Sequence, residues 1–153
     1  QKIFDLLASP AGHAVIDGSG SVKAPLANAP ERLALGTKFG MDMKLGVKYK
    51  ITNEVVEFEE GSRIAWRHFG GHIWRYILEP QADGTTKVTE EFDWKKNKSK
   101  LMLKVIGAFG KNHKSMEQTL LRMRDHFATA NENVQHRKPP SRKRNPGEEL
   151  RRG

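Results

Sequence analysis

The feature that most constrains the fold is a change in the spacing of apolar residues along the chain. Between residues 37 and 94 they recur at every second position, as in Phe39, Met41 and Met43. This is the period of a β-strand with one buried face. From residue 102 to residue 127 the spacings alternate between four and three, which is the period of an amphipathic helix. The chain is therefore predicted to form a sheet followed by one long helix.

Turn residues divide the sheet region into strands with short connections. The predicted strands are residues 37–45, 47–58, 63–69, 72–79 and 85–94, with a short one at 21–24, and two short helices are predicted at 2–8 and 10–16. Within 47–58 the apolar phase slips by one near residues 53–55, which predicts a β-bulge. A meander with one apolar face needs a cover, and the C-terminal helix is the one predicted element long enough to provide it. A bent sheet cannot close perfectly around a helix, so we expect a cavity between them.

Several segments carry a resemblance to a known superfamily. They are residues 3–8 with His13, then 16–20, 36–41, 64–68, 74–76 and 88–94. In these segments the chain resembles the START-like superfamily, also called SRPBCC, the polyketide cyclase/dehydrase and lipid-transport family. The resemblance covers residues 1 to about 130. It implies an α+β helix-grip fold, in which a curved antiparallel sheet wraps around a long C-terminal helix. Such domains begin with an edge strand before the first helix, so the chain is interpreted as an N-terminally truncated member.

Composition separates a body from a basic tail. The net charge is +9, and residues 136–153 hold seven basic and two acidic residues with no aromatic residue. We predict a START-like ligand-binding domain at 1–133 and a disordered basic tail at 134–153. The tail could bind nucleic acid or an anionic surface through phosphate contacts. A solvated tail is the favoured interpretation, because nothing in it would stack on bases.

Other classes of site find little support in the sequence. There is no cysteine, which excludes disulfides and thiolate chemistry. No His, Asp and Glu spacing is typical of a metal site, and no phosphate-binding loop is present, so neither a metal nor a cofactor is expected. No apolar run reaches the roughly 18 residues that span a bilayer. We expect a cytoplasmic protein.

The resemblance implies that the inward face of the sheet lines a ligand cavity. The predicted ligand-binding residues are Met41, Met43, Tyr49, Trp66, Trp74, Tyr76, Phe92, Ile106 and Phe109. Aromatic walls with a few polar groups suit a small-molecule site. For each residue taken alone, an ordinary place in the core is the alternative.

Two ionisable residues stand in phase with apolar neighbours. His68 follows Ile64 and Trp66 on one strand face, and Glu90 lies between Val88 and Phe92. Together they are candidates for a general acid–base pair. Alternatively, they pair with each other or lie in water at the end of the sheet. His113 falls on the apolar stripe of the helix and is predicted to be a core residue rather than a ligand.

These observations favour a module that binds or carries an apolar or aromatic small molecule or lipid in the cavity. An enzyme of the polyketide cyclase/dehydratase type that uses the same cavity is the alternative. The sequence leaves the ligand, any reaction and the oligomeric state open.

Overall fold

The helices and strands follow the predicted order. The computed structural model describes residues 1–95, 99 and 108–136. Its elements are α1 (Lys2–Leu7), α2 (Pro10–Ile16), β1 (Val22–Pro25), β2 (Lys38–Leu45), β3 (Val47–Glu59), β4 (Arg63–His68), β5 (Ile73–Pro80), β6 (Thr86–Asp93) and α4 (Ala108–His136). The predicted α+β class and helix-grip architecture are confirmed.

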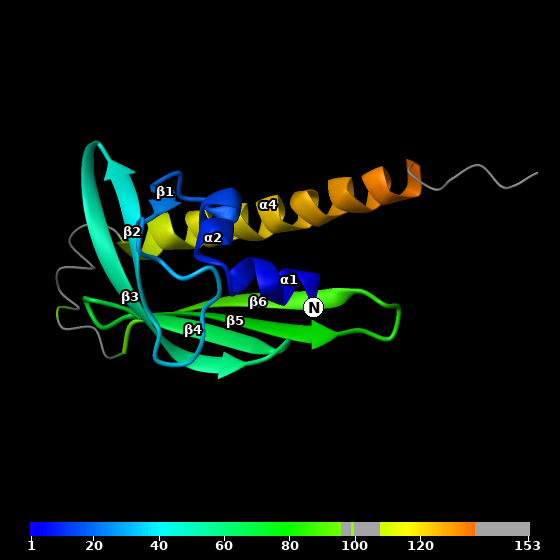
Figure 1. Ribbon diagram of the computed structural model, residues 1–153, viewed down its shortest axis with the longest axis horizontal. Helices are drawn as coiled ribbons and strands as arrows, with labels where there is room; N and C mark the ends of the chain where they lie inside the picture. The colour runs from blue at the N-terminus through cyan, green and yellow to red at the C-terminus, as the bar shows by residue number, and fades with distance from the viewer. Residues whose placement is uncertain (96–98, 100–107, 137–153) are drawn as a thin grey trace, which may run out of the picture.

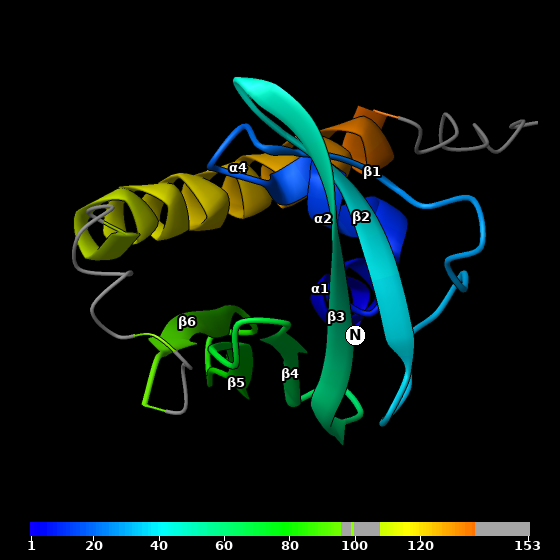
Figure 2. The same cartoon turned by 90° about the vertical axis from the view of Figure 1, so that its left-hand side faces the viewer.

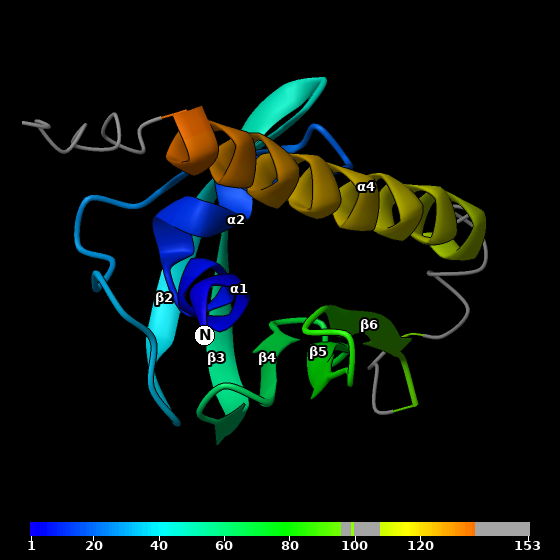
Figure 3. The same ribbon diagram turned by 90° about the vertical axis from the view of Figure 1, so that its right-hand side faces the viewer.

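The strands form one antiparallel sheet in which neighbours in space are neighbours in the chain. Its order is β1-β2-β3-β4-β5-β6. The sheet is strongly curled, and the described helices α1, α2 and α4 lie on its concave side (Figures 1, 2 and 3). Helix α4 runs across this side, with α1 and α2 between it and the strands (Figure 3). The sheet and α4 therefore enclose the interior from opposite sides.

A bulge in β3 bends the sheet. The pairing of β3 with β4 shifts register between Val55 and Glu57, just beyond the predicted slip. Because the bulge inserts one extra residue, Val55 and Phe58 both face inward although their spacing is odd. Val55 is buried, and Phe58 packs edge-on against Phe4 of α1, with 5.3 Å between the ring centroids. The bulge thus lets one strand follow the curve of the core.

Helix α4 approaches the loop after α2 closely. The backbone N–H of Gly18 donates to Oγ1 of Thr119, at 3.0 Å, and Arg122 donates to the carbonyl of Asp17. A Cβ atom at position 18 would lie only 2.3 Å from the carbonyl oxygen of Ser115. Only glycine therefore allows this approach.

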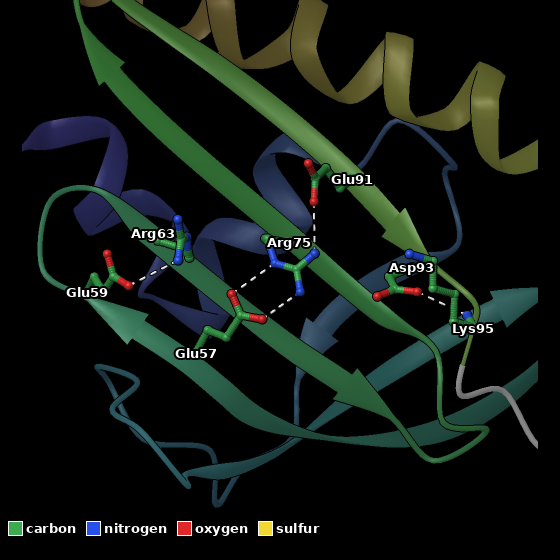
Figure 4. Close-up of polar contacts among 7 residues, drawn as sticks. All are labelled: Glu57, Glu59, Arg63, Arg75, Glu91, Asp93 and Lys95. Carbon is green, nitrogen blue, oxygen red and sulfur yellow. Dashed lines mark hydrogen bonds and ion pairs between the residues drawn. The ribbon is translucent and has the colours of Figure 1, made fainter.

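The outer face of the sheet carries an ion-pair network (Figure 4). Arg75 of β5 donates to both carboxylate oxygens of Glu57, at 2.9 and 2.6 Å, and to Glu91 at 2.8 Å. Ala65 of β4 lies between Glu57 of β3 and Arg75 of β5, since it pairs in register with both residues. Its small side chain leaves room for the arginine to reach across, and Ala65 is fully buried as a result.

One prediction about α4 is wrong. His113 is 78% exposed and pairs with Glu117 at 3.3 Å, whereas it was expected in the core. The cavity-facing line of the helix contains Asn112, Met116 and Thr119. His113 follows Asn112, and one residue corresponds to a rotation of about 100° on a helix. Its side chain therefore points away from the interior.

The described residues test only part of the predicted boundaries of the C-terminal helix and the tail. Helix α4 continues to His136, three residues past the predicted end of the domain at residue 133. The predicted tail from residue 137 on, and the predicted start of the stripe at Met102, lie outside the described residues. Within residues 1–95 and 108–136, no helix has the length and apolar character needed to cross a membrane.

Candidate functional site

A cavity of about 250 Å³ lies between the sheet, α2 and α4. Five of the predicted ligand-binding residues line it: Met41, Met43, Trp66, Trp74 and Tyr76. They come from β2, β4 and β5 and share the inward face because alternate residues of a strand point the same way. Trp66 packs against Tyr76, with 5.6 Å between the ring centroids. The predicted aromatic wall is therefore present in the structure.

The other predicted ligand-binding residues do not border this cavity in the described part of the chain. Tyr49 is 39% exposed and does not line the cavity. Phe92 pairs in register with Trp74, and 4.7 Å separate their ring centroids, but Phe92 does not line the cavity. Ile106 and the side chain of Phe109 lie outside the described residues.

Glu90 of β6 brings a carboxyl group into the apolar wall. Its Oε1 accepts a hydrogen bond from the hydroxyl of Tyr76 at 2.8 Å. Its Oε2 is buried and has no partner among the described residues. Burial raises the pKa of Glu90 to about 7, against a smaller lowering by the Tyr76 hydrogen bond. A carboxyl group of this kind can donate or accept a hydrogen bond near neutral pH.

His68 lies at a different level of the cavity from Glu90. Glu90 pairs in register with Tyr76, and Tyr76 with Ile64. Glu90 is therefore level with Ile64, four residues from His68, or about 13 Å along the strand. Both residues line the same cavity, but the structure does not bring them into direct contact. A ligand that joins them would have to span this distance.

A second histidine accompanies His68. The rings of His68 and His72 stack at 4.5 Å between centroids and 17° between planes, on either side of the turn at 69–71. Nδ1 of His68 accepts from the backbone N–H of Gly70 at 3.3 Å. Burial lowers the pKa of each ring to about 4, and repulsion from His72 adds to the shift at His68. Both rings are therefore neutral at pH 7 and suited to an uncharged ligand.

His13 of α2 is a cavity residue that the sequence analysis did not single out as one. Its Nε2–H donates to the carbonyl of Leu7 at 2.8 Å, which leaves Nδ1 without a proton. The ring stacks on Trp66, with 4.5 Å between centroids. Burial lowers the pKa of His13 to about 4. Its spacing of three from the buried Ile16 was the available signal, since both then lie on one face of a short helix.

The remaining polar groups of the cavity come from loops, from β3 and from α4. They are Asp17, Ser19, Ser21, Asn53, Asn112, Ser115 and Thr119. Asp17 holds its loop in place by accepting from the backbone N–H groups of Ser19 and Val22, both at 3.0 Å. In residues 1–95 and 108–136, no cluster of three His, Asp or Glu side chains could hold a metal ion.

Comparison with known proteins adds to this description. The chain is 34% identical over 132 residues to the uncharacterized protein Rv0088 of Mycobacterium tuberculosis strain H37Rv, and 33% identical to the uncharacterized protein MT0096 of strain CDC 1551. The matched region is 83% of this chain and 58% of either relative. The chain thus spans less than two thirds of the length of these curated relatives. No family model matches it.

Solved structures share its architecture. The AHSA1-like protein of Aeromonas hydrophila superposes with a TM-score of 0.57 at 14% identity, over 81% of this chain and 83% of that protein. Chr148 of Cytophaga hutchinsonii gives a TM-score of 0.50 at 15% identity, over 92% and 90% of the two chains. The chain shares the helix-grip fold of these structures. The predicted resemblance is confirmed at the level of this fold.

The helix-grip fold explains where the cavity lies. A sheet curled around a helix leaves space where the strands diverge from it, and side chains from both fill that space only in part. Here the partly filled space is bordered by Trp66, Trp74 and Tyr76 on the sheet and by Met116 on α4. Since one fold supports many functions, the choice of ligand depends on these side chains.

Proposed function

We propose that this protein binds a small molecule with an apolar or aromatic body and one hydrogen-bonding group. The observation that carries the proposal is Glu90, a carboxyl group in an aromatic wall whose Oε2 has no hydrogen-bond partner among the residues that the structure describes. A buried polar atom without a partner costs about 1–3 kcal/mol. If the carboxyl group of Glu90 turns toward the cavity, a ligand can supply the missing hydrogen bond and recover this cost on binding.

The size of the cavity favours a compact ligand. Its volume of about 250 Å³ lies just below the range of about 300–1,000 Å³ that is typical of drug-sized pockets. A fused aromatic ring system fits such a space, whereas a lipid with two acyl chains does not. Sequestration of an aromatic metabolite is therefore favoured over carriage of a membrane lipid.

The electrostatics of the cavity favour an uncharged ligand. His13, His68 and His72 all have pKa values lowered to about 4 by burial, so they supply no cation at pH 7. Glu90, with a pKa of about 7, is present in both its neutral and its charged form. A phenolic or alcoholic hydroxyl can hydrogen-bond to either form, which makes it the expected polar group.

Equilibrium dialysis with 2-naphthol and naphthalene tests the proposal. The two probes share one ring system and differ in one hydroxyl group. We expect 2-naphthol to bind at least about tenfold more tightly, because naphthalene leaves Glu90 unpaired. Glu90→Leu should abolish the preference. Glu91→Leu is the matched control, since Glu91 is adjacent in sequence and lies on the outer face, and it should keep the preference.

Two results would contradict this function. One is equal affinity of the wild-type protein for the two probes. The other is a preference that survives Glu90→Leu. Native mass spectrometry of the purified protein complements the dialysis, because a co-purifying compound identifies the natural ligand class directly.

An acid–base enzyme is the second candidate, and the pKa of Glu90 is the observation that favours it. A group with a pKa near 7 is well placed to transfer protons at neutral pH. When Glu90 is protonated it can donate to the Tyr76 oxygen, and the Tyr76 hydroxyl can then donate to a ketone oxygen. In an enzyme, Glu90→Gln should lower kcat by about 10²–10⁴-fold while a substrate is still bound. In a binding protein the same change alters affinity alone. Participation of His68 stays a prediction, to be tested in the same assay with His68→Ala.

A further inference from the structure

We propose that the tip of the β2–β3 hairpin docks on an anionic lipid bilayer. The hairpin tip comprises residues 44–50, with the sequence Lys-Leu-Gly-Val-Lys-Tyr-Lys. It combines two exposed aliphatic side chains with three lysines. This inference rests on the surface of the molecule and does not depend on which ligand the cavity holds.

One side of the hairpin tip is apolar and exposed. Leu45 and Val47 are directly opposite each other in the register, and they are 71% and 74% exposed. Tyr49 is next along the same face and is opposite the buried Met43. The apolar lining of the cavity therefore continues along this face to the end of the hairpin. Aliphatic side chains this exposed at a projecting end are typical of a surface that is covered by a partner.

The other side of the hairpin tip is cationic. Lys44 and Lys48 are directly opposite each other, and both are exposed. Like charges placed opposite each other across a strand pair are destabilising. Across the part of the chain that the structure describes, no acidic side chain forms an ion pair with Lys44, Lys48 or Lys50. An anionic surface would relieve this repulsion.

The position of the hairpin tip leaves it accessible. In all three views the turn between β2 and β3 projects past α4 and stands clear of the rest of the molecule (Figures 1, 2 and 3). Gly46 alone joins the two strands, with a φ of 75° that glycine adopts readily. The projecting end is therefore narrow, and it can enter a surface without disturbing other elements.

A bilayer matches both chemistries at once. Aliphatic side chains enter the boundary between headgroups and acyl chains, while lysines beside them contact anionic headgroups. A second copy of this protein fits poorly, because two hairpin tips would bring six lysines together. Nucleic acid would engage the lysines but would leave Leu45 and Val47 in water. The bilayer is therefore the partner that uses every exposed group of the hairpin tip.

Vesicle co-sedimentation of the full chain tests the docking. Vesicles of phosphatidylcholine with about 30% phosphatidylserine are compared with pure phosphatidylcholine at about 0.1 M salt. Leu45→Asn with Val47→Asn removes the apolar groups without changing the charge. A triple change of Lys44, Lys48 and Lys50 to Gln removes the cationic side. Each variant should bind anionic vesicles at least about tenfold more weakly than the wild type.

Matched controls separate the hairpin tip from general charge and from the basic tail, which is intact in every variant. Leu35→Asn changes an apolar side chain that is 67% exposed elsewhere. A triple change of Lys2, Lys38 and Lys87 to Gln removes the same charge from other sites. Both controls should bind anionic vesicles within about twofold of the wild type.

A labelling experiment reports directly on insertion. The chain has no cysteine, so an environment-sensitive dye can be attached at Val47→Cys, or at Leu35→Cys as the control. A blue shift with anionic vesicles at position 47 alone supports the proposal. It is overturned if the wild type does not bind anionic vesicles, if the variants of the hairpin tip bind as the wild type does, or if the dye at position 47 stays in water. It is also overturned if the lysine changes weaken binding to duplex DNA while binding to vesicles is unaffected.

Discussion

Glu90 and Glu91 are consecutive residues of β6, and they have opposite environments. Glu90 points inward, where its only described partner is the neutral hydroxyl of Tyr76. Glu91 points outward and pairs with Arg75, at 2.8 Å, in the network that also holds Glu57 (Figure 4). On the outer face Arg75 pairs with both Glu57 and Glu91, whereas no cation pairs with Glu90 among the residues that the structure describes. This difference supports our proposals that the ion pairs of the outer face contribute to stability and that the inner face binds a ligand.

The largest expected effect comes from the packing of the inner face. Trp66 is 8% exposed and contacts the rings of His13, Phe39 and Tyr76. Trp66→Ala should lower the free energy of unfolding by about 3–5 kcal/mol, since it leaves a large void. Urea denaturation measures the change. Phe69→Ala is the control, because Phe69 is 67% exposed, and similar losses from both substitutions would contradict the role given to the inner face.

The pH dependence of the free energy of unfolding should reveal the raised pKa of Glu90. Burial raises the pKa of Glu90 from 4.5 to about 7, so the folded chain holds this proton more tightly than the unfolded chain. The corresponding stability is present below pH 4.5 and is lost as the pH rises through 7. Glu90→Gln should remove up to about 3 kcal/mol of this loss.

Urea denaturation at several pH values between 4.5 and 8 provides the measurement. His13 acts in the opposite direction, because burial lowers its pKa to about 4 and its stability contribution is lost as the pH falls. That contribution is common to the wild type and to Glu90→Gln, so it cancels in their difference. A difference that stays constant with pH would show that Glu90 titrates as an ordinary carboxyl group.

The stability that the outer face contributes should change with pH in the opposite direction, and the change should be smaller. Hydrogen bonds from Arg75 are the main cause of the lowered pKa of Glu57, so this stability is present above pH 4.5 and is lost as the pH falls. Arg75→Gln should cost about 1–2 kcal/mol at pH 7, since the pair is only partly exposed. The cost should shrink at acid pH. If it grew instead, the outer network would not act through charge.

The smallest change in the free energy of unfolding is expected for an exposed ion pair at the end of the outer face. Lys87 pairs with Glu79 at 2.9 Å, with side chains 62% and 50% exposed. Lys87→Gln should change the unfolding free energy by less than about 0.5 kcal/mol, because solvent screens such a pair. A loss as large as that of Arg75→Gln would mean that partial burial is not what strengthens the Arg75 network.

Much of the fold was predictable because strand period and face are properties of the local sequence. The inward direction of Glu90 followed from its phase with Val88 and Phe92, and the bulge followed from the slipped phase in β3. The residue-by-residue pairing of the strands was harder to predict, since the spacing of apolar residues does not determine the register between two strands. The hydrogen bond from Tyr76 to Glu90, and the different levels of His68 and Glu90, became visible only when β4, β5 and β6 were aligned.

Other parts of the site depend on tertiary contacts that carry no local signal. Tyr49 has the right phase to face the cavity, but it lies near the end of the β2–β3 hairpin and is 39% exposed. Asp17 and Ser19 lie in a turn, and a turn sequence does not show which side chains border a cavity. His113 matched the spacing of the stripe, although the helix is rotated so that Asn112 faces the interior. Each case needed the position of α4 relative to the sheet.

The close contact at Gly18 has a consequence for the order in which the molecule forms and opens. Every pair of neighbouring strands is joined directly along the chain, so the sheet can assemble hairpin by hairpin with short loop closures. The hydrogen bond from Gly18 to Thr119 instead closes a loop of 101 residues. Docking of α4 on the sheet is therefore expected to be a late step of folding. Its undocking is expected to be a local opening of low free energy in the native state. Local opening of α4 would then expose the cavity to solvent, while the sheet keeps its shape.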